Sequence, residues 1–255
     1  MTRNASAKHM AAQQGSRVHI FDAARGFSVV SMVLFHYCYD LKFISGVPLE
    51  WFAPPLQDIW RASISWAFLF IAGCMCAHSR GNLRRGGIYM AFALLIFVVT
   101  TIAAVDVPIS FGIIFCMAAC TLLEWVLEKM RLSPNGYAAA VILFVVFLLL
   151  LGVPQGRVGV AGLSVAVPRA LYGSDYLSWL GFPGPTFASG DYYPLIPYFF
   201  MYLTGTACGR HWKQLGYPTW AYGKICRPLE FIGRHALEVY VLHQPLLLLL
   251  TGNFL

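Results

Sequence analysis

An otherwise apolar segment at residues 17–41 carries ionisable side chains on one face. Asp22, Arg25, His36 and Asp40 fall within an arc of about 60° when successive residues of a helix are placed 100° apart. Ionisable groups that face lipid are energetically costly, so a helix of this kind is expected to cross a bilayer with this stripe turned toward protein. The stripe is therefore the candidate functional site.

His36 and Asp40 are one helical turn apart, which suits a base and the carboxylate that orients it. A histidine takes up a proton near neutral pH, and a neighbouring carboxylate holds its tautomer and stabilises the charged ring. We therefore predict His36 as a proton acceptor and Asp40 as its partner. Two structural alternatives stay open: Asp22 and Arg25 form an ion pair, and His36 is a hydrogen-bonded core residue.

The composition is that of an integral membrane protein. Of the 255 residues, 58% are hydrophobic and 11% are charged, whereas soluble domains carry about 25% charged residues. The mean hydropathy is +0.65. Several apolar segments reach or approach the roughly 20 residues that cross a bilayer. They cover residues 23–43, 59–78, 87–105, 109–128, 136–153, 193–210 and 229–251.

These segments predict an all-α polytopic membrane protein with about seven transmembrane helices in one bundle. Residues 17–255 form this single domain, because the spans leave no room for a second one and no longer repeat is evident. Residues 1–16 are polar and lack the apolar core of a signal peptide, so a disordered tail is expected there.

The distribution of basic residues predicts the orientation of the spans. Of the 18 Lys and Arg residues, all but Lys42, Arg61, Arg157 and Arg169 fall on the side of the N-terminus. By the positive-inside rule, the N-terminus is cytoplasmic and the C-terminus extracytoplasmic, in the cytoplasmic membrane. Because topology accounts for the net charge of +7, no nucleic-acid partner is expected.

The last predicted span carries a second set of polar side chains. His243 and Gln244 precede a proline, which removes a backbone hydrogen bond and opens a local kink. His243 is expected near the level of His36, so the two histidines can share one cavity. Nearer the start of this span, Arg234 is placed to pair with Glu238 four residues on.

The connection at 154–192 is long and rich in Gly, Pro and aromatic residues. Long structured loops of this kind often act as lids or binding loops, and flat aromatic rings can stack on an acceptor. An interfacial aromatic belt is an equally good interpretation.

The seven cysteines lie mostly within or at the ends of spans and lack CxxC spacing. Buried small side chains are their expected role, and close helix packing is expected at Gly73. A soft-metal site at the CxC pair of the second span is a less favoured alternative, as is a zinc site at His36, Asp40 and His243. No metal is expected.

Several separated stretches, taken in order, resemble one family of membrane enzymes. They are FDAARGFSVVSMVLFHYCYDL, FIAG, ISFGII, FPG followed by DYYPLIPY, and FIGRHALEVYVLHQP. Together they resemble the heparan-alpha-glucosaminide N-acetyltransferase catalytic-domain family, especially its small bacterial members, within the transmembrane acyltransferase superfamily. Arg25 and His36, with ten residues between them, are also similar to the pair that opens the first helix of bacterial membrane O-acyltransferases.

The resemblance implies a CoA-dependent acyltransferase embedded in a lipid bilayer. It would move an acyl group, acetyl in this family, from cytosolic acyl-CoA to a glycan or lipid-linked acceptor on the extracytoplasmic side, and homo-oligomers are compatible with it. His36 and Asp40 are then the catalytic residues. The arginines expected to meet CoA phosphates are Arg25, Arg80, Arg84 and Arg85. The expected substrate-binding or supporting residues are Asp22, Asp191, Arg234, His243 and Gln244.

The sequence departs from the family pattern at two places. The stretch after the first helix reads ISGVPLEW and holds no histidine, whereas the lysosomal member has its catalytic histidine there. Phe115 stands where many bacterial relatives have a histidine. The family's catalytic roles are therefore not carried over whole.

Two other classes of protein compete with the enzyme. Intramembrane His and Asp residues also form proton relays, so a proton-coupled small-molecule transporter is the first alternative. Charges confined mainly to the first span and an odd number of helices disfavour it. A structural membrane protein is the second alternative, and acyl-CoA binding by the purified protein would separate the enzyme from both.

Overall fold

The computed structural model describes residues 18–252 except residues 105 and 161. The predicted tail at residues 1–16 lies outside this part of the chain. The chain divides into two compact units, which are described one at a time. Unit 1 combines the residues up to Phe68 with those from His211 onward, and unit 2 runs from Leu69 to Arg210.

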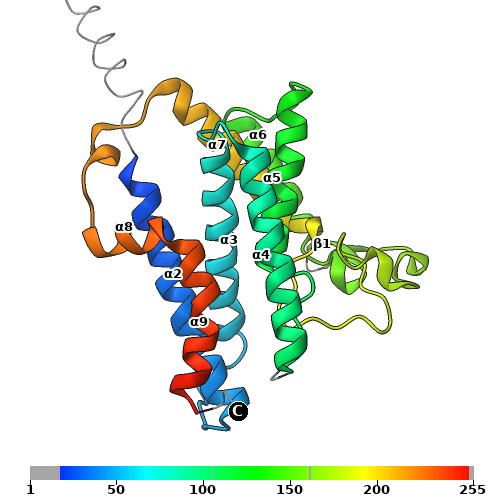
Figure 1. Cartoon of the computed structure of the whole chain (residues 1–255). Helices are drawn as coiled ribbons and strands as arrows, with labels where there is room; N and C mark the ends of the chain where they lie inside the picture. The colour runs from blue at the N-terminus through cyan, green and yellow to red at the C-terminus, as the bar shows by residue number, and fades with distance from the viewer. Residues whose placement is uncertain (1–17, 105, 161, 253–255) are drawn as a thin grey trace, which may run out of the picture. The chain divides into compact units, whose positions relative to one another are not determined.

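Unit 1 is built around the long helix α2 (His19–Tyr39), which continues as a short π-helical segment η1 (Asp40–Ile44). α8 (Arg227–Arg234) and α9 (Ala236–Leu250) both pack against α2 (Figure 1). The unit also holds the first part of α3 (Leu56–Cys76), the end of α7 and the 3-10 turn η5 (Thr219–Tyr222).

Two glycines let α2 and α8 approach backbone to backbone. A Cβ atom on Gly26 would lie 1.9 Å from the carbonyl oxygen of Leu229, and one on Gly233 would lie 1.9 Å from the carbonyl oxygen of Asp22. Neither position can hold a larger residue without moving main chain. This close approach sets where the polar side chains of α2 lie relative to α8.

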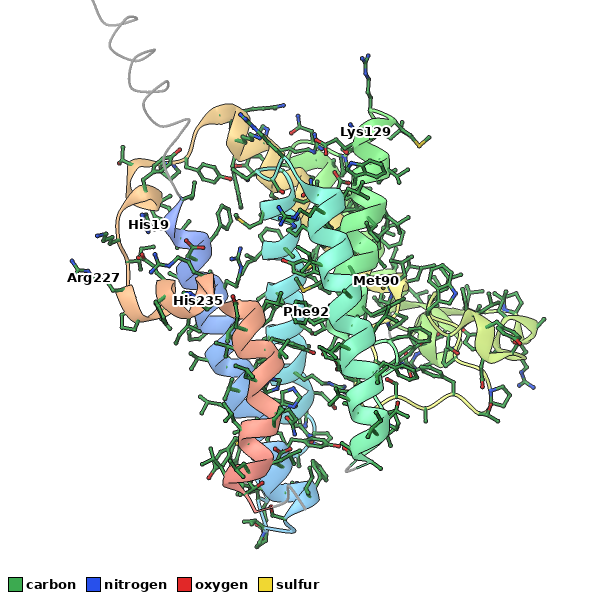
Figure 2. The ribbon with its side chains drawn as sticks, in the orientation of Figure 1. His19, Met90, Phe92, Lys129, Arg227 and His235 are labelled. Atoms are coloured by element: carbon green, nitrogen blue, oxygen red, sulfur yellow. The ribbon has the colours of Figure 1, made fainter. Side chains whose placement is uncertain are left out.

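The structure corrects the prediction of one continuous span at 229–251. The backbone leaves helical geometry at His235, whose N–H bonds back to carbonyl oxygens of the preceding turn and ends α8. Figure 2 labels His235 at this break between α8 and α9. Arg234 and Glu238 therefore belong to different helices, and the described residues form no ion pair between them. The guanidinium of Arg234 lies instead over the ring of Phe231, 6.0 Å from its centroid.

Unit 2 contains four further helices and a small hairpin. The helices are α4 (Asn82–Ala103), α5 (Ile113–Lys129), α6 (Tyr137–Leu150) and α7 (Leu195–Leu215), whose backbone is non-helical at Ile196. α4 and α5 run side by side (Figure 1). The antiparallel hairpin pairs β1 (Arg157–Val160) with β2 (Leu163–Ala166).

Glycines also form the contact between α7 and the part of α3 that belongs to unit 2. A Cβ atom on Gly73 would lie 2.0 Å from the carbonyl oxygen of Tyr202, and one on Gly205 would lie 2.0 Å from that of Phe70. One turn further, a Cβ atom on Gly209 would come 2.6 Å from a carbonyl oxygen of α3. The predicted packing role of Gly73 is confirmed.

The long connection folds as a compact loop with its own hydrogen bonds. Its segments are η2 (Val153–Gln155), the hairpin, η3 (Arg169–Tyr172) and η4 (Asp175–Leu177). The hydroxyl of Tyr192 donates to the carbonyl oxygen of Ser178 at 2.6 Å, and burial raises the pKa of this phenol. Other rings of the loop, such as Tyr176, are exposed. Both interpretations of the aromatic residues, binding loop and interfacial belt, therefore stay predictions.

The fold is that of a helical membrane protein, as predicted. By length and composition, four helical segments of the described chain can cross a membrane: His19–Ile44, Leu56–Cys76, Asn82–Ala103 and Tyr137–Gln155. α5 and α9 are shorter, with 17 and 15 residues. The last turns of α7 are polar, with Arg210, His211 and Lys213. The count of seven spans stays a prediction.

Replacing Gly205 by alanine is expected to lower the free energy of unfolding by about 1–3 kcal/mol, because the new methyl group collides with main chain of α3. The measurement is thermal unfolding of the purified protein in detergent. Gly87→Ala is the matched control, since a Cβ atom at that helical position has no atom within 4 Å apart from its own stretch of helix. Equal melting temperatures for the two variants would contradict the packing argument.

Candidate functional site

Four polar side chains meet in unit 1 where α2 ends and α9 passes it. The carboxylate of Asp40 is fully buried. The amide nitrogen Nε2 of Gln244 lies 2.9 Å from one of its oxygens and 3.1 Å from the other, and donates to the carboxylate. The rings of His36 and His243 lie beside each other with their centroids 4.8 Å apart. The structure thus brings together four of the residues that the sequence singled out.

Local backbone features place these side chains. α2 widens into a π-helical turn at Asp40. Such turns are rare in proteins, and those that occur are often found at functional sites. On α9, Pro245 has no N–H and lies directly after His243 and Gln244. A π-helical turn after α2 and a proline inside α9 therefore lie next to the polar group.

The ring of His243 has one bonded and one unbonded nitrogen. Nδ1 lies 2.6 Å from the carbonyl oxygen of Tyr240. Nε2 is buried and has no hydrogen-bond partner among the described residues. The side chain is only 8% exposed. Because no described residue bonds to this nitrogen, it can form a hydrogen bond with a bound molecule.

Asp22 and Arg25, the other two residues of the α2 stripe, take part in contacts between and within helices. Nη1 of Arg25 donates to the carbonyl oxygen of Gly233 at 3.1 Å and lies 3.7 Å from a carboxylate oxygen of Asp22. The structural ion pair considered from the sequence is thus formed within α2, and the hydrogen bond from Arg25 to Gly233 joins α2 to the end of α8. A role of Arg25 in donor binding stays a prediction.

Next to this contact lies a carboxylate that the sequence analysis did not select. Glu230 on α8 accepts hydrogen bonds from the N–H of Ile225 and from Nδ1 of His19, both at 2.8 Å. The bond from the backbone N–H is the main reason that the pKa of Glu230 lies below its usual value. Its position in the first turn after Pro228 was the available signal, since acidic residues favour helix N-termini.

The predicted arginine cluster divides into two kinds of side chain. Arg80 and Arg84 are exposed at the start of α4. Arg85 turns into unit 2, where its guanidinium donates to the carbonyl oxygen of Met75 and to the hydroxyl of Tyr202, both at 3.4 Å. Nε of Arg85 and Oδ1 of Asn82 are buried without partners among the described residues.

A buried ion pair in unit 2 was also missed. Glu124 is fully buried and lies 3.3 Å from Nη2 of Arg210, which also lies 3.3 Å from Glu128. Glu124 and Arg210 sit near the ends of two apolar segments, and a charge inside such a segment was the available signal. Nearby, the hydroxyls of Thr121 and Tyr202 are hydrogen-bonded at 2.9 Å.

Asp191 has a structural position. One of its carboxylate oxygens accepts a hydrogen bond from the N–H of Ile113 at 3.0 Å, at the beginning of α5. A carboxylate in this position satisfies an otherwise unbonded N–H and complements the helix dipole. A substrate-binding role for Asp191 stays a prediction.

No metal centre is found in the described part of the chain: no three His, Cys, Asp or Glu side chains there are arranged to hold an ion. Cys116 and Cys120 lie with their sulfur atoms 3.8 Å apart, and both are buried thiols. Their burial fits the role of small buried side chains expected for the cysteines.

The helices and the buried ionisable side chains define a helical integral membrane protein with polar groups held inside its units. Residues 17–245 match the family model described as heparan-alpha-glucosaminide N-acetyltransferase, catalytic. The chain belongs to this family, as its resemblance predicted, and membership indicates a membrane acetyltransferase. No curated protein and no solved structure is similar enough to the chain to count as a match.

Gln244→Leu is expected to lower the free energy of unfolding by about 1–3 kcal/mol, because the buried carboxylate of Asp40 loses two hydrogen bonds. Chemical or thermal unfolding in detergent measures it. Gln155→Leu, at an exposed position, controls for the added apolar side chain. A Gln244→Leu protein as stable as the control would show that the contact contributes little.

Proposed function

We propose that this protein transfers an acetyl group from acetyl-CoA to a hydroxyl or amine of a glycan or lipid-linked acceptor. Family membership supports the acetyltransferase class. The observation that carries the proposal is the group of two histidines, a carboxylate and a carboxamide at the end of α2, in which Asp40 and His243 are buried. An acyl transfer needs a proton acceptor beside the attacking atom, and this group offers imidazole nitrogens for that purpose.

The reaction requires that one proton leave the hydroxyl or amine of the acceptor. The acceptor oxygen or nitrogen attacks the thioester carbonyl carbon, the carbon–sulfur bond breaks, and CoA leaves. His36, with Asp40 as its orienting carboxylate, is the base that helical spacing favours. The two hydrogen bonds from Gln244 keep Asp40 in a fixed position, which supports a role in the reaction centre.

Binding of the donor falls to the arginine cluster at the start of α4. CoA carries phosphates, which guanidinium groups bind well. The exposed Arg80 and Arg84 are available to phosphates. The unpartnered Nε of Arg85 and Oδ1 of Asn82 are a donor and an acceptor that suit polar groups of the nucleotide. Arg25 is the fourth arginine of the proposal.

The arrangement in the membrane is part of the same proposal. Seven spans put the N-terminus in the cytoplasm and the C-terminus outside, so that the arginine cluster faces cytosolic acetyl-CoA. The end of α2 that carries His36 and Asp40 then lies toward the extracytoplasmic side, where the acceptor is. The protein would thus take the acetyl group from one compartment and deliver it in the other.

A proton-coupled transporter is the alternative function. The paired histidines are compatible with transport, but family membership gives the transporter no support. The two functions differ in one direct observation. A transporter leaves its substrate chemically unchanged, whereas the proposed enzyme leaves an acetyl group on a surface molecule.

Double replacement of Arg80 and Arg84 by glutamine is expected to weaken acetyl-CoA binding about tenfold or more, because two phosphate contacts are lost. Scintillation proximity with labelled acetyl-CoA on purified protein measures this dissociation constant. Arg169→Gln, at an exposed arginine predicted on the other side of the membrane, is the control. Equal affinity in a correctly inserted double variant would leave these arginines with a topological role only.

Deleting the gene is expected to remove one acetyl mass from a cell-surface glycan or lipid, and restoring it is expected to bring the mass back. Mass spectrometry of both fractions measures this change. If the strains with and without the gene show the same acetylation of surface glycans and lipids, the proposed function is wrong.

A further inference from the structure

We propose that His243, on α9, is the residue that takes the proton from the acceptor. This inference rests on the proposed function and changes the identity of its base, because the sequence favours His36. It comes from the contacts of the His243 ring, which the structure gives and the sequence does not predict.

The bond at Nδ1 determines where the hydrogen of His243 sits. The carbonyl oxygen of Tyr240 can only accept, so Nδ1, 2.6 Å away, carries the hydrogen. A neutral imidazole has one hydrogen, which leaves a lone pair on Nε2. A backbone carbonyl is a common way to hold a histidine in one tautomer. The ring is thus prepared as a base before any substrate is bound.

The position of Nε2 indicates what should bind there. The atom is buried and has no hydrogen-bond partner in the described part of the chain, on a side chain that is 8% exposed. A buried acceptor without a donor is unfavourable. The missing partner is therefore a donor, and the O–H or N–H of an acceptor substrate is such a group.

His36 differs from His243 in this respect. Its ring packs against the rings of His243 and Phe35, with centroids 4.8 and 5.9 Å away. Within the described residues, no hydrogen bond to protein fixes the tautomer of His36. His36 therefore lines the reaction centre next to the base, and its ring helps to hold His243 in place.

The reaction balances with His243 alone. The attacking oxygen or nitrogen of the acceptor gives its proton to Nε2 as its bond to the thioester carbonyl carbon forms. The carbon–sulfur bond then breaks with its electron pair on sulfur. The imidazolium returns the proton to this thiolate, which gives free CoA and a neutral His243. No oxidant, reductant or metal takes part in these steps.

Restoring the deletion strain with His243→Asn tests the assignment. An asparagine amide can still donate to the Tyr240 carbonyl but offers no basic nitrogen, so the helix contact is retained. Acetylation rates are expected to fall 10²- to 10⁴-fold, while the affinity of the purified variant for acetyl-CoA changes less than threefold. His36→Ala is expected to cost less than His243→Asn. Normal acetylation by His243→Asn, or a greater loss in His36→Ala, would overturn the assignment.

A second measurement does not depend on the acceptor. Nitrogen NMR of histidine-labelled protein in detergent, with the His243 signals assigned by their loss in His243→Asn, reports the tautomer directly. Hydrogen on Nδ1 and a bare Nε2 are expected. Hydrogen on Nε2 would refute the inference even if the protein is an acetyltransferase, whereas unchanged surface acetylation after gene deletion would refute the proposed function.

Discussion

A carboxylate that is fully buried among apolar helices is unstable unless donors hydrogen-bond to it. In this protein the donor comes from a distant part of the chain. Asp40 receives two hydrogen bonds from one carboxamide, that of Gln244, 204 residues away. Gln244 directly follows His243, so the contact that stabilises the buried charge also holds the histidine beside α2. The contact that stabilises the buried carboxylate and the position of His243 therefore depend on the same pair of side chains.

The helices around this contact are held by close backbone approach. Apolar side chains gain little from leaving lipid for a protein interior, so helices in membranes associate through small residues and polar contacts. Gly26 and Gly233 provide the close approach in unit 1, and Gly73 and Gly205 provide it in unit 2. Arg25 adds a hydrogen bond to the carbonyl oxygen of Gly233 at the same crossing. One half of the charged stripe on α2 thus serves packing.

Periodicity was enough to predict which residues of α2 share a face, and the helix rise was enough to bring His243 to the level of His36. Neither periodicity nor helix rise could predict the Gln244–Asp40 bond or the tautomer of His243, because both depend on how α9 is rotated against α2. The break at His235 was missed although Gly233, Arg234 and His235 interrupt the apolar composition there, because the polar side chains were assigned to the polar face of one continuous helix. The pair of Glu124 and Arg210 spans 86 residues, and no local pattern joins them.

The distribution of titratable groups along α2 favours an enzyme over a proton carrier. A relay across the membrane needs such groups at short intervals, yet Arg25 and His36 are separated by about 16 Å of helix at 1.5 Å per residue. The polar side chains between them are hydroxyls in local contacts. Ser28 donates to a carbonyl oxygen of its own helix, and Ser31 accepts from the indole N–H of Trp60. No titratable side chain therefore lies between Arg25 and His36 on α2, which disfavours a proton path along this helix and agrees with the acetyltransferase class that family membership indicates.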